Sequence, residues 1–443
     1  MDKVYDFVII GGGPAGSTAA SNLARNGFKV LVLEKEKFPR FHVGESLLPF
    51  CYGLFKDLGV LGQMEKEFKR KPGVTFSNSD NTNSSNWCFN HLIKDDSHLS
   101  FHVERDRFDK ILLERSRELG AEVLEATQVS SVDFSSNKHV KVVTKSEECF
   151  LANFLIDASG QDAFLGKLQG TKRNQPQLSQ RIALSAHWEK AKLDPILKEG
   201  NLRIVSLEGR KKGWIWMIPV SDQRLSVGVV VELDYFKSKK RNEKSSSSDW
   251  LRDFYISEVN SCRLGKEVLT SAKMAMEVAV NSNYSFDVSQ KYGDRFAVIG
   301  DAASFLDPMF ASGVFVGMKS AMLVTNALLN INEGEYESEL IDAYSQISGA
   351  YQLLELMITT FYNPDAIKFS ELDHGSISEY KKLDTVFGIM HLVLAGDFFS
   401  NHKNYLKAIE VLSSAKMVER FRHLTNHTDT QTSQVCTKSM LSI

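Results

Sequence analysis

The chain is poor in cysteine and has no long apolar run. Its five cysteines are odd in number, widely spaced and form no C-x-x-C pair, which argues against a disulfide framework and a zinc site and favours a reducing compartment. The longest apolar run, VFGIMHLVLAG near residue 390, is too short to span a bilayer. The first residues run directly into a strand pattern without the apolar region of a secretion signal. We therefore expect a cytoplasmic protein without a metal centre or an integral membrane segment.

The chain also lacks an excess of charge of either sign. The chain has 53 basic and 55 acidic side chains among 443 residues, with a net charge of −2. A balance of this kind gives no indication of nucleic-acid binding. With 43% hydrophobic residues, the chain can bury a large core and form two or three fused units.

The N-terminal region predicts a β-α-β unit. Apolar residues at 8–10 precede glycines, an alanine-rich helical stretch at 17–26 and a second apolar run at 30–33. Later β-rich segments (KHVKVVT, FLIDASG, RLSVGVVVEL and RFAVIGDAA) alternate with helical patterns, and the chain is mainly helical from about residue 315. The pattern indicates an α/β fold.

The glycines after the first strand have the spacing of a dinucleotide-binding turn. Gly11, Gly13 and Gly16 form G-x-G-x-x-G between a strand and a helix, which permits a tight turn, a close approach of a pyrophosphate and close helix packing. A helix N-terminus favours an anion there. Glu34, at the end of the second strand, has the place of the carboxylate that accepts hydrogen bonds from a ribose.

The segment KKGWIWMIPV alternates strictly. A β-strand would place Trp214, Trp216 and Ile218 on one buried face. Periodicity alone favours a core strand whose large aromatic rings fill space.

Three further segments resemble the FAD-binding segments of the flavin monooxygenase superfamily with a p-hydroxybenzoate-hydroxylase-like fold. They are HVERDRFDKILL, NFLIDASG and RFAVIGDAASF. The resemblance implies that Arg105 and Asp301 contact the pyrophosphate and ribityl parts of FAD. The full set of cofactor residues that it implies is Gly11, Gly13, Pro14, Ala15, Gly16, Glu34, Lys35, Arg40, Ser46, Arg105 and Asp301. No second G-x-G-x-x-G accompanies them for a nicotinamide cofactor, so we expect reduced flavin from a separate flavin reductase.

This resemblance implies a Rossmann-like FAD-binding domain interleaved with a β-sheet substrate domain, followed by a mainly helical C-terminal region. We expect the FAD-binding domain at residues 1–75, 105–180 and 286–330. Substrate-domain strands and a polar loop occupy 76–104, and the β-rich substrate domain occupies 181–285. Residues 331–422 form the helical substrate region and 423–443 a disordered tail. Polar segments at 78–86 and 237–248 are expected to be excursions from the core.

Within the superfamily, the chain is similar to flavin-dependent halogenases of the phenol or pyrrole type. The segments that carry the resemblance are FPRFHVGESLLP, RKPGVTF, GWIWMIPV and FLDPMFASGV. In that family reduced FAD and O2 give a C4a-hydroperoxide, which oxidises chloride or bromide to hypohalous acid, and the acid passes to a lysine. Lys71 matches that lysine. Its ammonium can donate to an oxygen, its amine can carry the halogen, and burial would make the amine more accessible. Composition alone favours a solvated lysine in the basic run FKRKPG.

The resemblance also implies a barrier and a halide site. Trp214 and Trp216 would separate flavin from the substrate, and the backbone N–H groups of Ser312 and Gly313 would hold the halide at a helix start. Without the family, a serine cap before a flexible glycine explains these two residues equally well. Position 311, where the family has serine, holds Ala311, so a possible hydroxyl donor to the oxidant is missing.

The expected substrate is an aromatic ring that is already electron-rich. Phe310 stands where tryptophan-specific members carry a glutamate. This favours a phenol, a polyketide-derived resorcinol or phloroglucinol, or a pyrrole, either free or tethered to a carrier protein. His42, His102 and His391 can each be considered as a base for a phenol, but a structural role is favoured for each.

Three alternatives stay open at this level. An FAD-dependent aromatic hydroxylase would insert oxygen, although Lys71 and the two tryptophans argue against it. A reductase of the geranylgeranyl type shares the GES segment. A non-catalytic flavin-binding relic would agree with Ala311.

Overall fold

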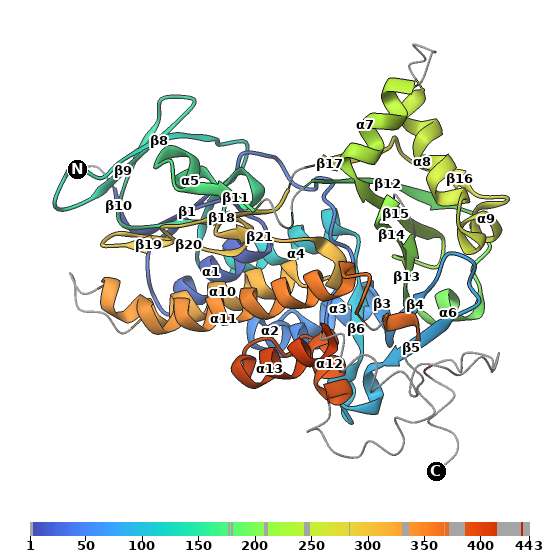
Figure 1. The fold of residues 1–443 in the computed structure, drawn as a ribbon. Coiled ribbons are helices and arrows are strands. Elements are labelled where there is room, and N and C mark those ends of the chain that lie inside the picture. Colours follow the sequence, from blue (N-terminus) through green and yellow to red (C-terminus); the bar gives the residue numbers. More distant parts are fainter. Residues whose placement is uncertain are drawn as a thin grey trace.

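The computed structural model describes residues 3–175, 178, 180–207, 211–242, 249–282, 284–329, 336–366, 368–371, 386–413 and 436. Two large sheets stand side by side, and the long helices α10 and α11 run below the first (Figure 1). The fold confirms the α/β prediction and the p-hydroxybenzoate-hydroxylase-like arrangement of strands and helices.

The first sheet is the expected nucleotide-binding sheet. Its order is β19-β20-β10-β1-β2-β7, and β8 and β9 extend it beside β10. Strands β1, β2, β7, β10 and β20 run parallel, and α1 connects β1 to β2, so the predicted β-α-β unit is confirmed. Helix α1 packs against α4 and α10. The bounds are β1 (Val4–Ile10), α1 (Pro14–Arg25), β2 (Val30–Leu33), α4 (Arg105–Glu118), β7 (Glu122–Leu124), β8 (Val129–Asp133), β9 (Val140–Thr144), β10 (Cys149–Asp157), β19 (Tyr292–Gly293), β20 (Phe296–Val298) and α10 (Gly313–Leu328).

The second sheet has the order β16-β12-β15-β14-β13-β4-β5, with β17 beside β12. Helices α7, α8 and α9 lie on the side of this sheet that is away from the first sheet (Figure 1). The bounds are β4 (Gly73–Ser77), β5 (Ser84–Cys88), β12 (Arg181–Glu189), β13 (Leu202–Leu207), β14 (Gly213–Pro219), β15 (Arg224–Glu232), α7 (Leu233–Asn242), α8 (Trp250–Asn260), α9 (Arg263–Leu269), β16 (Lys273–Met274) and β17 (Ala279–Ser282).

Strand β14 confirms the alternation. Trp214, Trp216 and Ile218 belong to one apolar cluster, whereas Ile215 and Met217 belong to another on the opposite face. Both faces of the strand are therefore buried, because helices or other strands cover each of them.

The C-terminal region is helical in its described parts, as predicted. Helices α11, α12 and α13 pack together and cover the tryptophan face of β14 with α2. The bounds are α2 (Cys51–Leu58), α11 (Tyr336–Tyr362), η7 (Phe369–Glu371), α12 (Val386–Ala395) and α13 (His402–Ser413).

Shorter elements complete the fold. They are α3 (Leu61–Glu67), β3 (Lys69–Lys71), η1 (Phe89–His91), η2 (Asp96–His98), β6 (Ser100–His102), η3 (Gly160–Asp162), α5 (Phe164–Leu168), β11 (Lys172–Asn174), α6 (Pro195–Glu199), β18 (Phe286–Val288), η5 (Gly300–Ala302), β21 (Ser304–Phe305) and η6 (Pro308–Phe310).

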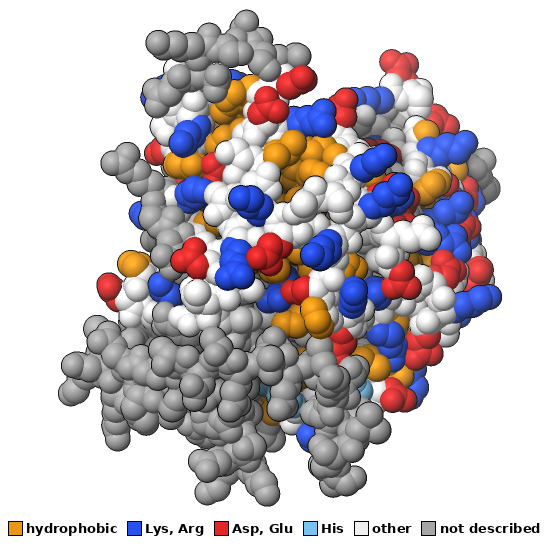
Figure 2. Space-filling model, turned by 90° about the vertical axis from the view of Figure 1, so that its right-hand side faces the viewer, with side chains coloured by type: hydrophobic (Ala, Val, Ile, Leu, Met, Phe, Trp, Pro, Cys, Tyr) orange, Lys and Arg blue, Asp and Glu red, His pale blue; other side chains and the backbone are white. Residues whose placement is uncertain are grey.

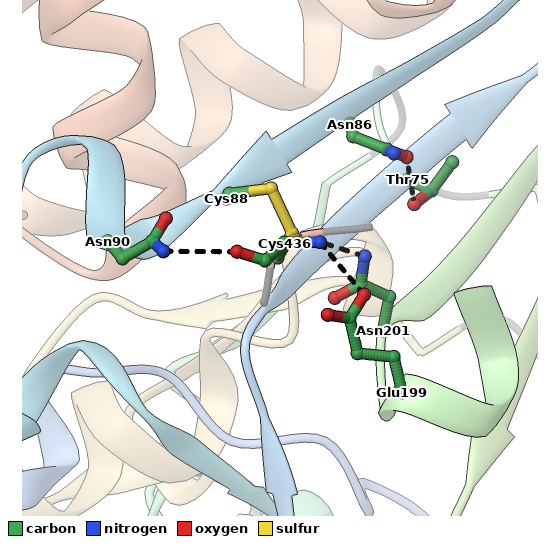
Figure 3. The surroundings of a disulfide bond; sticks show 7 residues. All are labelled: Thr75, Asn86, Cys88, Asn90, Glu199, Asn201 and Cys436. Atoms are coloured by element: carbon green, nitrogen blue, oxygen red, sulfur yellow. Dashed lines mark hydrogen bonds between the residues drawn. A yellow bond between two sulfur atoms is a disulfide. The ribbon is translucent and has the colours of Figure 1, made fainter. Parts of the chain in front are cut away.

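The cysteine pattern argues against disulfide bonds, and this expectation is wrong for one pair of cysteines. Cys88 and Cys436 form a disulfide that joins positions 348 residues apart (Figure 3). The backbone N–H of Cys436 donates to Glu199 at 2.9 Å, and its carbonyl accepts from Asn90 at 3.2 Å. The sequence could not reveal this pair, because only the fold brings the end of β5 to the C-terminal segment. Cys51, Cys149 and Cys262 are free.

The polar segments differ from one another. Residues 78–83 form the turn between β4 and β5, and residues 237–242 belong to α7. Residues 243–248 and the predicted tail after 423 lie outside the described residues, apart from position 436.

Where the structure is described, no helix is long and apolar enough to cross a membrane, and no cluster of His, Cys, Asp and Glu could hold a metal ion. Figure 2 shows basic and acidic side chains interspersed over the described part of one face.

Candidate active site

A cavity of about 640 Å³ lies between the two sheets. Ile10 and Leu33, at the carboxyl ends of β1 and β2, form one wall, and Trp214 and Trp216 of β14 form another. Ligands bind at the carboxyl ends of strands in open α/β sheets. The cavity therefore joins the predicted nucleotide site to the predicted tryptophan barrier.

The glycine turn is shaped for a pyrophosphate. Gly11 has φ +100°, and a Cβ there would lie 2.4 Å from the carbonyl oxygen of Ala158. A Cβ on Gly16 would lie 1.9 Å from the carbonyl oxygen of Gly11, so the close helix packing needs glycine. A Cβ on Gly13 would meet only Arg40, at 3.6 Å. The space above Gly13 thus leaves the backbone at the start of α1 open to a phosphate.

Glu34 is held at the end of β2. Its two carboxylate oxygens accept from the backbone N–H of Gly12 at 2.6 Å and of Glu36 at 2.9 Å. The side chain lines the cavity. This geometry agrees with the predicted contact to a ribose.

Two arginines share one buried carboxylate. Arg105 donates to Asp109 at 2.8 and 2.9 Å, and Arg40 donates to the same side chain at 3.0 Å. Burial opposes the ionisation of Asp109, but the charge of Arg105 and its hydrogen bonds lower its pKa overall. Arg40 also pairs through Nε with Glu36 at 2.9 Å, and both guanidinium groups line the cavity, where their N–H groups can face a pyrophosphate. Sequence reasoning missed Asp109, although its i+4 spacing from Arg105 was a usable signal.

Two polar side chains of the cavity wall are available to a ligand. Ser46 lines it, and its buried Oγ has no hydrogen-bond partner. Asp301 also lines it; burial raises the pKa of Asp301 to about 6, against the charge of Arg105. A polyhydroxylated, anionic ligand would supply donors to both side chains, so the residues present fit FAD.

The other expected cofactor residues also lie at this cavity. Pro14 and Ala15 line it at the start of α1. Lys35 lines it too, and its Nζ forms an ion pair with Asp162 at 2.6 Å.

Lys71 is buried, contrary to the reading from composition. The side chain is 1% exposed, and its Nζ donates to the carbonyl of Leu47 at 2.9 Å and lies 5.5 Å from the centre of the Phe89 ring. Burial lowers the pKa of Lys71 to about 7. Glu45 and Ser46, directly before Leu47, line the cavity. Lys71 itself does not line the cavity; the carbonyl of Leu47, next to the lining residue Ser46, joins it to the cavity wall.

The tryptophans are fixed in the wall of the cavity. Their ring centres lie 5.5 Å apart. Trp214 Nε1 donates to the hydroxyl of Tyr362 at 2.9 Å, and Trp216 Nε1 donates to Ser226 at 3.2 Å. The ring of Trp216 lies over Gly228, where an added Cβ would come within 2.0 Å of it.

The loop before α10 also reaches the cavity. Ser312 and Gly313 line it, and α10 begins at Gly313. The Ser312 side chain makes no capping hydrogen bond, so the first N–H groups of α10 keep the unpaired character of a helix start. Ala311 adopts a left-handed conformation with φ 53°.

Of the three histidines, His42 lines the cavity and places its Nδ1 2.7 Å from the carbonyl oxygen of Val43, whereas His102 and His391 do not line it. Burial lowers the pKa of His42 to about 4. His102 bonds through Nε2 to the carbonyl of Gly200 at 2.7 Å. His391 is buried, and its ring packs edge-on against Trp87.

Comparison with known proteins agrees with this site. Residues 4–351 match the family model described as FAD binding domain. The chain is 31% identical to a tryptophan 2-halogenase of Chondromyces crocatus, over 82% of this chain and 68% of that protein. It is 28% identical to the 1H-pyrrole-2-carbonyl-[peptidyl-carrier protein] chlorinase of Pseudomonas fluorescens, over 90% of this chain and 96% of that protein.

The fold is also that of a solved halogenase. The structure of the flavin-dependent brominase Bmp2 superposes with a TM-score of 0.77 at 25% identity, covering 95% of this chain and all of that chain. The protein is thus a flavoprotein of the FAD binding domain family. Within that family it belongs to the flavin-dependent halogenases.

Proposed function

We propose that this halogenase modifies an electron-rich aromatic ring and that Lys71 receives the hypohalous acid. The observation that carries the proposal is the burial of Lys71, which is 1% exposed and bonded to the segment next to the cavity; burial lowers its pKa to about 7. Reduced FAD with oxygen supplies the chemistry that oxidises the halide. A lysine of this kind presents both an ammonium, which donates to an oxygen, and an amine, which can take up a halogen near neutral pH.

Each wall of the cavity has a proposed task. Gly11, Gly13, Pro14, Ala15, Gly16, Glu34, Lys35, Arg40, Ser46, Arg105 and Asp301 hold FAD. The N–H groups of Ser312 and Gly313 hold chloride or bromide. Trp214 and Trp216 exclude the organic substrate, so that only a small oxidant crosses. The division into FAD-binding and substrate segments given above is part of this proposal.

The proposed substrate class is supported by Phe310, which lies between the cavity-lining residues Met309 and Ala311. This ring is 5% exposed and packs against Phe361 and Phe369, with ring centres 6.3 and 5.8 Å away. No carboxylate stands at this position to assist a weakly nucleophilic ring. A phenol, a resorcinol or phloroglucinol, or a pyrrole would need none. Tethering to a carrier protein is supported by the pyrrolyl-carrier chlorinase among the relatives.

A separate flavin reductase and a cytoplasmic location are also proposed. The sequence offers one dinucleotide fingerprint, which the FAD site uses. The Cys88–Cys436 disulfide is the one observation that counts against a cytoplasmic location, because cytoplasmic proteins keep most thiols reduced.

Product analysis tests the function. The purified protein is supplied with FAD, a flavin reductase, NADH, oxygen and chloride or bromide, and phenols, resorcinols and pyrroles are screened by mass spectrometry. We expect a halogen isotope pattern that depends on the halide and on the reductase. An oxygenated product would favour the aromatic hydroxylase instead. Turnover with NADH and FAD but without the reductase would contradict the need for a partner.

A further inference from the structure

A buried carboxylate lies where the two sheets and the C-terminal helices meet. Asp307 is 2% exposed and lines the cavity. Its Oδ2 accepts from the hydroxyl of Tyr362 at 2.9 Å and of Tyr284 at 3.4 Å, and its Oδ1 accepts from the N–H of Met309 at 3.1 Å. Three separate parts of the chain therefore depend on one carboxylate.

The same network reaches the barrier. Trp214 Nε1 donates to the hydroxyl of Tyr362, which itself donates to Asp307. A tyrosine hydroxyl has one donor, and here it is used on the carboxylate while a lone pair accepts from the indole. The single hydroxyl of Tyr362, at the end of α11, thus fixes the direction of the Trp214 ring.

Arg181 balances the buried charge. Its guanidinium carbon lies 3.4 Å from the centre of the Tyr362 ring, and its Nε lies 3.9 Å from Asp307 Oδ2. A buried carboxylate is costly unless it is paired and hydrogen-bonded. Arg181 comes from β12 of the second sheet, so its charge also ties that sheet to the loop of Asp307.

Asp307 also determines the start of the proposed halide loop. Its side chain caps the short turn η6 by accepting from Met309. That turn leads through Ala311 to Ser312 and Gly313. A displacement of the carboxylate would move the barrier and the amides of the loop together.

We propose that Tyr362 and Asp307 are positioning residues that fix the Trp214 ring relative to the loop at 311–313. They thereby determine how much of the oxidant ends in halogenated product. The inference rests on the barrier and halide roles proposed above. It adds Tyr362, from outside the motifs that define the site, and Asp307, a residue of the segment FLDPMFASGV to which no role was assigned above.

The fold offers a matched pair for comparison. Tyr405 donates from its hydroxyl to Asp397 at 2.8 Å, and both residues are buried. Neither of them lines the cavity. Tyr405→Phe therefore removes an equivalent tyrosine–aspartate hydrogen bond without touching the barrier.

The test compares Tyr362→Phe with Tyr405→Phe and the wild type. The measured quantity is halogenated product formed, and hydrogen peroxide released, per reduced FAD consumed. We expect Tyr362→Phe to give about fivefold less product per reduced FAD, because two hydrogen bonds are lost. Raised halide concentration should restore part of the product, because the loop is also displaced. Tyr405→Phe should keep the wild-type ratio, and all three proteins should bind FAD.

A folded Tyr362→Phe variant that binds FAD and keeps the wild-type ratio would overturn the inference. If Tyr362→Phe does not fold, the same ratio is measured for Asp307→Asn. This substitution keeps the shape of the side chain but removes the charge that faces Arg181 and Tyr362. A wild-type ratio in Asp307→Asn would equally overturn the inference. A wild-type protein that yields no halogenated product would instead contradict the proposed function itself.

Discussion

The ammonium of Lys71 donates to the carbonyl oxygen of Leu47 at 2.9 Å, while Ser46, one residue earlier, faces the flavin cavity with an unpaired hydroxyl. The chain segment that would touch the cofactor therefore also holds the candidate catalytic lysine. Segment 45–47 is anchored by β6, since Leu47 N–H donates to Phe101 at 2.9 Å and Val103 N–H donates to Glu45 at 2.8 Å. One short segment thus connects the candidate catalytic lysine to the wall of the cavity.

The burial of Lys71 predicts a pH-dependent cost in stability. In the unfolded chain the lysine keeps its proton up to about pH 10.5, but in the folded chain only up to about pH 7. The unfolded state thus binds more protons between these values, and the free energy of unfolding rises with pH across this window. Lys71→Met should stabilise the protein by up to about 5 kcal/mol at pH 6. The gain should shrink as pH rises from 7 to 10.5.

Urea unfolding at several pH values measures this effect. Lys69→Met, on the same strand β3, is the matched control, because Lys69 is only partly buried and pairs with the exposed Asp222. A gain in stability of equal size in both variants, or one that does not depend on pH, would show that the protonated Lys71 side chain does not destabilise the folded state.

Asp301 should show the opposite pH dependence. Burial raises its pKa to about 6 from 3.8, so the unfolded carboxylate releases its proton first and stability falls as pH rises between these values. Asp301→Asn should stabilise the FAD-free protein by up to about 3 kcal/mol at pH 7, and this gain should fade towards pH 4. The same variant should bind FAD at least tenfold more weakly, because the amide keeps one acceptor oxygen but loses the second acceptor and the negative charge that strengthens both hydrogen bonds.

Thermal melting with and without FAD measures both effects of Asp301→Asn. Asp294→Asn, in the turn between β19 and β20, should change neither quantity. An Asp301→Asn variant that binds FAD as tightly as the wild type would remove Asp301 from the cofactor site.

Gly228 should be needed for the barrier. It lies opposite Trp216 in the β14–β15 pair, and a Cβ would come within 2.0 Å of the indole ring. Gly228→Ala should cost about 1 to 3 kcal/mol through overpacking. It should also increase hydrogen peroxide released per reduced FAD, since the displaced ring no longer closes the wall.

The control for this substitution is Gly53→Ala. Gly53 lies on the exposed face of α2, where a Cβ meets nothing within 4 Å. Alanine there should stabilise the protein by about 0.5 to 1 kcal/mol. Unchanged stability and peroxide release in Gly228→Ala would show that the Trp216 ring is free to move aside.

Much of this site could be predicted because its parts are local in sequence. Gly11, Gly13 and Gly16 lie within one turn, and the alternation around Trp214 is a property of a single strand. The environment of Lys71 could not be predicted in the same way. Its burial depends on Leu47 and Phe89, which reach it only through tertiary structure.

The same reason explains what sequence reasoning missed. Tyr362 is one of 12 tyrosines and belongs to no motif, yet it meets Trp214, 148 positions earlier. Cys88 and Cys436 are separated by 348 positions. Pairs of this kind are determined by the fold as a whole and have no local spacing that could indicate them.

The disulfide predicts how many cysteines can be alkylated in the native, denatured and reduced protein. Of the free thiols only Cys149 is exposed, so alkylation of the native protein should label one cysteine. Denaturation without reductant should expose Cys51 and Cys262 as well, and reduction should release the remaining two. Reduction should also lower the free energy of unfolding by about 2 to 4 kcal/mol. Five labelled cysteines without reductant would contradict the pairing.

The central claim is that Lys71 passes the halogen to the substrate, and single-turnover experiments with Lys71→Met test it most directly. The variant and the matched Lys69→Met are loaded with reduced FAD, then mixed with oxygen, halide and an accepted aromatic substrate. We predict that Lys71→Met still binds FAD and consumes reduced flavin, but loses at least a hundredfold in halogenated product and releases the oxidant as hypohalous acid or hydrogen peroxide. Lys69→Met should keep wild-type product. Wild-type halogenation by a folded, FAD-loaded Lys71→Met protein would contradict the claim.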